Sequence, residues 1–144
     1  MIRILCVGKI KEKFYRDAIL EYLKRLSKYH HVVIEEVQDS NIKNEKELLL
    51  KKITDKDYVI TLEIEGEEVN SIELSHLIDK TFLITSNITF VIGGSDGLDD
   101  DVKKRANKRL SFSKLTFPHQ LFRVILLEQI YRSFKILHGE SYHK

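Results

Sequence analysis

The sequence predicts an α/β domain in which helices cover both faces of a mainly parallel sheet. Three observations lead to this fold class. Residues 2–7 are almost all apolar, as expected for a strand that is buried on both faces. Patterns typical of strands and helices alternate along the chain, which is the order of parallel βα units. The segment 119–137 is apolar on more than one helical face, so its own domain or a partner subunit must enclose it.

The strand at 2–7 is followed by a predicted helix and a second strand. Apolar residues recur at helical spacing over 12–27. Within this helix Glu21 precedes Arg25 by four residues, the favourable order for an ion pair. Residues 31–37 then have the composition of a strand.

A short helix and the third strand come next. Asn44 is expected to cap the helix, with Glu47 placed to reach back to it, and the helix ends near residue 53. The run 58–64 is rich in β-formers and is predicted to be a strand that ends at Gly66.

The capping pattern occurs again before the fourth strand. Asn70 and Glu73 have the spacing of a capping box, and apolar residues at helical spacing continue to Phe82. Residues 87–92 are then predicted to form a fourth strand.

The last third of the chain carries two helices and one more strand. Residues 99–105 begin with acids and end with bases, which suits the dipole of a short helix. Residues 110–113 alternate like a strand. Pro118 lies where the start of a helix tolerates proline, and the helix 119–137 follows.

Composition excludes several classes of protein. The 144 residues fit one domain of ordinary size. The single cysteine, Cys6, excludes an internal disulfide framework and a zinc site, and we expect it to pack in the core. No secretory signal or long uncharged apolar run is visible, so we expect a cytoplasmic protein without membrane spans.

The charge balance is weak for a free-standing nucleic-acid-binding protein. There are 24 basic and 22 acidic residues, a net charge of +2. The basic residues nevertheless form two clusters, and each is either a solvated helical face or a local patch that contacts phosphates. The clusters are Lys9, Lys11 and Lys13 near the start, and Lys103, Lys104, Arg105, Lys108, Arg109 and Lys114 later in the chain.

A glycine-rich turn over 93–97 follows the fourth strand and is the most informative feature of the chain. Glycine lets a ligand approach bare backbone, and ligands of open α/β sheets bind at the carboxyl ends of the strands. The turn matches neither the dinucleotide fingerprint nor a P-loop, so by itself it could be purely structural. A second unusual stretch, 110–120, combines small hydroxyl residues, two aromatic residues and a proline where another strand ends.

Together with the C-terminal tail, these stretches resemble the RlmH-type family of SPOUT methyltransferases. The resemblance spans essentially the whole chain, which implies a single SPOUT domain over 1–144. The motifs that carry it are Val7-Gly8-Lys9, Thr61-Leu62-Glu63, Phe90-Val91-Ile92-Gly93-Gly94, Leu110-Ser111-Phe112-Ser113 through Phe117-Pro118-His119, Glu128-Gln129-Ile130-Tyr131-Arg132 and Tyr142-His143.

The resemblance implies a C-terminal trefoil knot and a homodimer whose active site uses both subunits. It also implies an activity, the S-adenosylmethionine-dependent methylation of N3 of a pseudouridine in 23S rRNA on the assembled ribosome. No metal is implied. The cofactor-binding residues that it implies are Leu62, Gly93, Phe112, Ser113, Lys114, Leu115, Thr116 and Phe117.

The resemblance further implies that Arg132, Tyr142, His143 and Lys144 carry the catalysis. His143 is a candidate for the base, and Arg132 for holding a phosphate or stabilising the anion of the nucleobase. The residues alone leave simpler explanations open. Arg132 lies four residues after Glu128 and could form a surface ion pair, and the tail could be frayed.

Two other classes of function remain open from the residues alone. The chain could be a non-enzymatic ribosome-associated factor that binds RNA through the later basic cluster. It could also be a metabolic nucleotide-binding enzyme, although the dinucleotide fingerprint is missing. For the methyltransferase, the small net charge predicts that isolated rRNA fragments are poor substrates beside assembled ribosomes.

Overall fold

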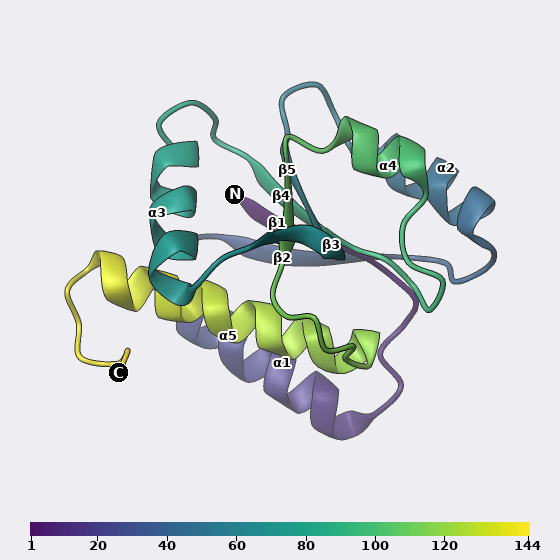
Figure 1. The fold of residues 1–144 in the computed structure, drawn as a ribbon. Helices are drawn as coiled ribbons and strands as arrows, with labels where there is room; N and C mark the ends of the chain where they lie inside the picture. The colour runs from purple at the N-terminus through teal and green to yellow at the C-terminus, as the bar shows by residue number, and fades with distance from the viewer.

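The computed structural model describes residues 1–144 and contains one five-stranded sheet (Figure 1). The strand order is β2-β1-β4-β3-β5, and every neighbouring pair is parallel. The strands are β1 (Ile2–Val7), β2 (Val32–Val37), β3 (Tyr58–Glu68), β4 (Ile88–Ile92) and β5 (Lys108–Ser111). The helices are α1 (Lys13–Leu26), α2 (Ile42–Lys52), α3 (Ser71–Thr81), α4 (Asp100–Arg105) and α5 (His119–Leu137).

The helices form two layers, as the sequence predicts. Helices α1, α3 and α5 cover one face of the sheet, and α2 and α4 cover the other (Figure 1). Alternate residues of β1 enter the two cores, with Ile4 and Cys6 on the α5 side and Leu5 and Val7 on the α2 side. The Cys6 thiol is buried as predicted, and burial raises its pKa to about 12.

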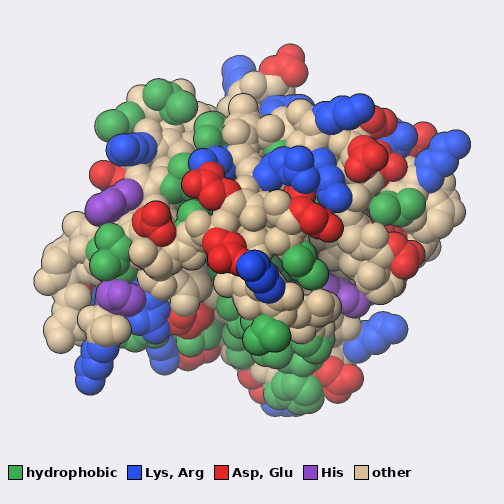
Figure 2. All heavy atoms as spheres, in the orientation of Figure 1, with side chains coloured by type: hydrophobic (Ala, Val, Ile, Leu, Met, Phe, Trp, Pro, Cys, Tyr) green, Lys and Arg blue, Asp and Glu red, His purple; other side chains and the backbone are tan.

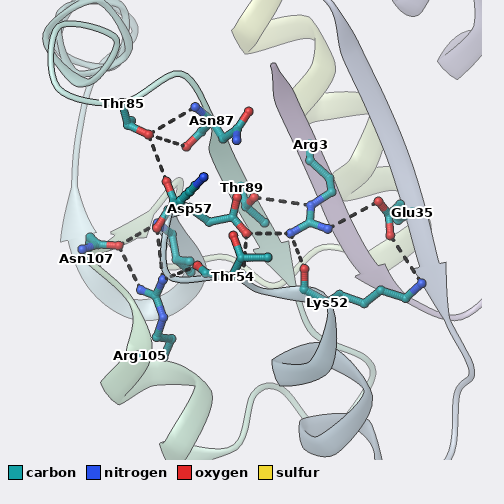
Figure 3. Close-up of polar contacts among 12 residues, drawn as sticks. Arg3, Glu35, Lys52, Thr54, Asp57, Thr85, Asn87, Thr89, Arg105 and Asn107 are labelled. Atoms are coloured by element: carbon teal, nitrogen blue, oxygen red, sulfur yellow. Dashed lines mark hydrogen bonds and ion pairs between the residues drawn. The ribbon is translucent and has the colours of Figure 1, made fainter.

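One charged residue, Arg3, lies in this buried strand and is fully partnered (Figure 3). Its Nη2 donates to the carbonyl of Lys52 at 2.7 Å and to Asp57 Oδ2 at 3.0 Å. Its other nitrogens reach Thr89 Oγ1 and Glu35 Oε1, both at 3.4 Å. A buried guanidinium is tolerated here because carboxylates and a carbonyl replace its water.

The N-terminal cap of α3 is the predicted one, whereas the cap of α2 differs from the prediction. Asn70 and Glu73 form the predicted capping box at the start of α3. The predicted cap Asn44 is wrong, because α2 begins at Ile42 and its cap is Asn41. Asn44 is instead the residue whose backbone N–H donates to Asn41 Oδ1 at 2.9 Å. Two Asn residues three positions apart both fit the pattern, and the earlier one has the extended backbone that a cap requires.

Strand β3 does not end at Gly66 but continues beyond it. Leu110 of β5 pairs with both Leu62 and Glu67, so the residues between these two positions of β3 form a bulge. A Cβ at Gly66 would lie 2.5 Å from the carbonyl carbon of Leu110, so the two backbones approach too closely for a side chain.

Strand β5 spans Lys108–Ser111 and not the predicted 110–113. Two serine side chains turn the chain away from the sheet. Ser111 Oγ donates to the carbonyl of Ser113 at 3.0 Å, and Ser113 Oγ accepts from the N–H of Leu115 at 2.9 Å. Hydroxyl side chains that bond nearby backbone compete with the strand ladder, which explains the early end.

Helix α5 has the predicted bounds and packs between α1 and α3. Its inward face is buried. Its outward face carries a half-buried stripe at helical spacing, Leu121, Ile125, Glu128, Arg132 and Ile136. No helix of the structure has the combination of length and hydropathy that crossing a bilayer requires.

Candidate functional site

A cavity of about 460 Å³ lies at the carboxyl ends of β3, β4 and β5. Three segments and the first turn of α5 surround it: the β3 bulge, the glycine turn after β4 and the loop after β5. The lining residues are Leu62, Glu63, Ile64, Glu65, Ile92, Gly93, Gly94, Ser95, Asp96, Gly97, Leu98, Lys103, Ser111, Phe112, Ser113, Leu115, Thr116, Phe117, His119 and Phe122. This is the place in an open α/β sheet where ligands bind.

The glycine turn presents bare backbone to the cavity. The N–H of Gly97 donates to the carbonyl of Gly94 at 3.0 Å, and Gly97 has a φ of +80°. A Cβ at Gly93 would lie 2.5 Å from the carbonyl oxygen of Gly97, so no other residue fits at this position without moving backbone. Sequence and packing therefore both require glycine here.

The buried carboxyl of Glu45, from α2, supports the turn from behind. A Cβ on Gly94 would lie 3.1 Å from Val7 Cγ1 and 3.4 Å from Glu45 Oε1. Glu45 Oε2 accepts a hydrogen bond from the N–H of Ser40 at 2.9 Å, and burial raises the pKa of Glu45 above its usual range. Helix α2 thus places Glu45 close to Gly94 without lining the cavity.

Aromatic rings form another part of the cavity lining. Phe122 of α5 packs edge-on against Phe112 at 5.3 Å between ring centroids, and it stacks on Phe117 at 6.0 Å. Leu115, at the tip of the same loop, is 71% exposed. A lining that combines aromatic side chains with bare backbone suits a ligand with a flat, weakly polar portion.

The β3 bulge gives the cavity an acidic side. Glu63 accepts hydrogen bonds from Arg109 and, at 3.0 Å, from the hydroxyl of Thr61. Burial alone would raise the pKa of Glu63, but these two donors hold it below its usual range. Glu65 and Asp96 add two further carboxylates to the lining. The cavity therefore favours a cationic ligand.

A second group of polar residues surrounds Glu128, on the outward face of α5. Glu128 Oε2 accepts from Arg132 Nη2 at 2.9 Å and from the hydroxyl of Tyr142 at 2.8 Å. Arg132 Nη1 lies 3.1 Å from His143 Nδ1, and its guanidinium lies 4.8 Å from the centre of the Tyr142 ring. Burial and the neighbouring Glu128 raise the pKa of Tyr142 to about 12. The Glu128 carboxylate thus joins Tyr142 of the C-terminal tail to α5, and Lys135 of α5 adds a second contact, with Glu140 at 2.8 Å.

With this geometry established, comparison with known proteins identifies the family. The sequence model described as "Predicted SPOUT methyltransferase" matches residues 1–143. This chain belongs to the SPOUT methyltransferase family. It is 55% identical to Ribosomal RNA large subunit methyltransferase H of Clostridium botulinum (strain Kyoto / Type A2), over 99% of both chains. It is 47% identical to the protein of that name from Carboxydothermus hydrogenoformans, also over 99% of both.

Solved structures share the fold of this chain. A probable methylase family protein from Haemophilus influenzae Rd KW20 matches with a TM-score of 0.58 and 10% identity, covering 99% of this chain and 70% of that one. The tRNA (m1G37) methyltransferase of Aquifex aeolicus matches with a TM-score of 0.55 and 16% identity, covering 91% and 69%. At these identities the likeness concerns the fold alone. The family resemblance predicted from the sequence is confirmed.

The structure gathers most of the predicted cofactor residues of this SPOUT protein around the cavity. Leu62, Gly93, Phe112, Ser113, Leu115, Thr116 and Phe117 all line it. Lys114 is exposed and does not. Sequence reasoning missed Glu63, Ile64 and Glu65 of the bulge. The signal that could have found them was Gly66, a glycine after a strand that invites close backbone approach.

Three of the four predicted catalytic residues lie together, and the fourth does not. Arg132, Tyr142 and His143 contact one another or Glu128, whereas Lys144 is exposed. Sequence reasoning noted Glu128 only as an ion-pair partner of Arg132. That ion pair exists, but Glu128 also binds Tyr142, so the predicted alternative of a frayed tail does not describe Tyr142.

The two groups of residues, around the cavity and around Glu128, are separate within this SPOUT chain. None of the four predicted catalytic residues lines the cavity. His119, the first residue of α5, does line it. No group of three or more His, Cys, Asp or Glu side chains is placed to hold a metal ion.

Proposed function

We propose that this chain, acting as one SPOUT domain, methylates N3 of a pseudouridine in 23S rRNA with S-adenosylmethionine as methyl donor. The observation that carries the proposal is full-length identity of 47–55% to large-subunit rRNA methyltransferases named H. The cavity supports it as well, because seven of the eight cofactor residues that the resemblance implies line it. The ribosome places the reaction in the cytoplasm.

The residues around the cavity fit S-adenosylmethionine. A volume of about 460 Å³ is within the range of ligand pockets, roughly 300–1,000 Å³. Leu62, Leu115 and Phe117 would hold the adenine, the bare backbone at Gly93 would take the ribose or methionine portion, and Glu65 and Asp96 complement positive charge. When bound, this cofactor supplies an electrophilic methyl group.

The contact between Arg132 and His143 constrains the acid–base chemistry. A guanidinium has only donors, so His143 Nδ1 must accept the bond from Arg132 Nη1. The neutral imidazole then carries its proton on Nε2. In this arrangement His143 presents an N–H donor, suited to a carbonyl oxygen of the pyrimidine ring, and its Nδ1 is not free to take the N3 proton.

Arg132 and Tyr142 complete the assignment. The Arg132 charge, oriented by Glu128, would stabilise the negative charge that develops on the pyrimidine as N3 loses its proton to bulk water. Tyr142, whose pKa is raised to about 12, stays protonated at neutral pH and donates to Glu128. Tyr142 therefore positions the tail and does not act as the base.

The separation of the two groups favours a homodimer with composite sites, each cavity receiving the tail of the other protomer. The outward stripe of α5 provides an interface that would bring the tail there, because Leu121, Ile125 and Ile136 are apolar and share a face with Arg132. This arrangement would also bury the apolar residues on the outward face of α5, which the sequence analysis expects a domain or a partner subunit to enclose.

We also infer the trefoil knot of the α/β-knot fold. Strand β5 lies beyond β3, and the chain passes from α4 on one face of the sheet to α5 on the other (Figure 1). The beginning of α5 is deeply embedded, because Arg123 is fully buried against the end of β1. A knotted crossing would hold the cofactor loops rigid and lower the ordering cost of binding.

The test is methylation of ribosomes by the purified protein. Large subunits from cells that lack the gene, incubated with protein and S-adenosylmethionine, should gain one methyl group on 23S rRNA by mass spectrometry. Calorimetry that shows no binding of the cofactor at millimolar concentration would contradict the proposal. Ribosome co-sedimentation that Gly93→Arg leaves intact, without methyl transfer by wild type, would favour the non-enzymatic factor.

The nature of the substrate gives a second measurement. Because its net charge is only +2, we expect the protein to bind isolated RNA weakly through phosphate contacts. Assembled ribosomes should therefore be methylated much faster than a stem-loop that carries the same nucleotide. Equal turnover on both would contradict the proposed preference.

A further inference from the structure

We propose that the loop between β1 and α1, with the first turn of α1, contacts the phosphate backbone of the substrate RNA. The residues are Lys9, Lys11 and Arg16, which we call the β1–α1 basic surface. The inference rests on the proposed function, since an enzyme that acts on RNA needs phosphate contacts to position its substrate.

The two basic clusters of the sequence differ in how many of their side chains already form ion pairs or hydrogen bonds within the fold. In the later cluster, Lys108 Nζ lies 2.6 Å from Glu67, and Arg109 is paired with Glu63. Arg105 donates to two backbone carbonyl groups. Figure 2 shows blue and red side chains interleaved over α4 and β5. Three of the six residues of this cluster are therefore used within the fold, whereas Lys103, Lys104 and Lys114 form no ion pair.

Two of the three lysines of the early cluster form no ion pair, and neither does the neighbouring Arg16. Lys9 and Lys11 are exposed and form no ion pair, and Arg16 reaches only the carbonyl of Lys11, at 3.5 Å. Lys13 is the one member that is paired, with Asp17 at 2.7 Å. The nine residues that begin at Lys9 contain four cations and two carboxylates, a net +2 that equals the charge of the whole chain.

The loop that carries Lys9 and Lys11 is held rigidly. The fully buried Arg123 donates to the carbonyls of Val7 at 2.8 Å and Gly8 at 2.7 Å. The N–H of Lys11 donates to Gln120 Oε1 at 3.2 Å. Because the backbone of the loop is already ordered, placing its two ammonium groups against phosphates costs less entropy.

The surface also lies beside the proposed cofactor cavity. One turn of α5 faces both: His119 and Phe122 line the cavity, while Gln120 and Arg123 hold the basic loop. RNA bound through Lys9 and Lys11 would therefore pass close to the mouth of the cavity, where the target base must enter.

Two charge-matched double variants test the proposal. Lys9→Gln/Lys11→Gln removes the surface, and Lys43→Gln/Lys51→Gln removes two exposed, unpaired lysines of α2 on the other face of the sheet. We expect the first to weaken binding to purified large ribosomal subunits by about ten-fold at low salt and to reduce the salt slope by about 2. The control should change neither, and calorimetry should show that both variants bind S-adenosylmethionine like wild type.

The alternatives have distinct outcomes. If both double variants lose the same affinity for ribosomal subunits, only the net charge of the protein matters. That result would overturn the proposed role of the β1–α1 basic surface. A loss for subunits with an unchanged salt slope and unchanged binding of poly(U) would indicate a protein contact and overturn the RNA assignment. Failure of the proposed function would look different. The wild-type protein would then bind subunits through this surface but transfer no methyl group.

Discussion

One carboxylate oxygen, Glu128 Oε2, accepts hydrogen bonds from both the hydroxyl of Tyr142, at 2.8 Å, and Arg132 Nη2, at 2.9 Å. Glu128, on the helix, thus binds a residue of the C-terminal tail that lies 14 positions further along the chain. The arrangement places His143 beside Arg132. Glu128 is therefore a positioning residue for the tail.

Substitution of Glu128 tests this role. Glu128→Gln removes the charge that orients Arg132, and hydrogen bonds to charged groups are worth about 1.5–3 kcal/mol. We expect the single-turnover rate of methyl transfer to fall at least about ten-fold, with the affinity for S-adenosylmethionine unchanged. Glu21→Gln is the matched control, because Glu21 forms the same i,i+4 pair with Arg25 on α1. Weaker cofactor binding in Glu128→Gln would contradict the assignment.

Titration of Tyr142 tests its environment. Burial and Glu128 raise its pKa from the ordinary 10.0 to about 12. Since the folded value is the higher one, the stability that this group contributes is complete below pH 10.0 and is lost as the pH rises through about 12. Difference absorbance of phenolate, wild type minus Tyr142→Phe, should show one tyrosine that titrates near 12. In Glu128→Gln this tyrosine should titrate at a lower pH, and an unchanged midpoint would argue against the contact.

The glycine turn gives a steric prediction. In Gly93→Ala the new methyl group would lie 2.5 Å from the carbonyl oxygen of Gly97, so the turn must shift. We expect cofactor affinity, measured by calorimetry, to fall by about ten-fold or more. Gly97→Ala is a useful comparison, because its Cβ meets nothing within 4 Å and only its φ of +80° is unfavourable. It should cost about 1–2 kcal/mol of stability with less loss of affinity. The reverse order of affinities would contradict this account.

Local signals predicted the elements of this fold well, and non-local contacts account for the errors. The capping box at Asn70 and the bounds of α5 depend on residues within one or two helical turns, so the sequence contains them. The bulge of β3 depends on Gly66 meeting the backbone of Leu110, a neighbour that is distant in sequence. No periodicity within 58–68 indicates that approach.

The candidate site shows the same division. The glycine turn is visible in the sequence because glycine itself marks it, and seven of the eight residues named for the cofactor line one cavity. The connecting role of Glu128 is not visible, because it requires the tail to fold back on α5. The acidic side of the cavity is also not visible, because it depends on the bulge of β3.

The buried Arg3 gives a prediction about stability. Arg3→Met leaves the buried carboxylate of Asp57 with only the N–H of Thr54 as a hydrogen-bond partner among its present contacts. Breaking a buried pair from one side costs about 3–5 kcal/mol. Arg25→Met, which breaks an exposed pair, should cost less than about 1 kcal/mol. Urea unfolding of both variants measures the difference, and similar losses would mean that Asp57 finds another partner or water.

Mixing two inactive variants tests the composite site. Gly93→Arg should abolish cofactor binding, and Arg132→Ala should abolish methyl transfer while its cavity stays intact. If each cavity uses the tail of the other protomer, a heterodimer of the two variants contains one complete site. Random exchange of subunits in an equimolar mixture should then restore about a quarter of wild-type activity. If each chain instead used its own tail, neither site of the heterodimer would be complete and the mixture would stay inactive. Ile125→Asp, which places a charge on the outward stripe of α5, should give monomers by sedimentation and abolish the restored activity.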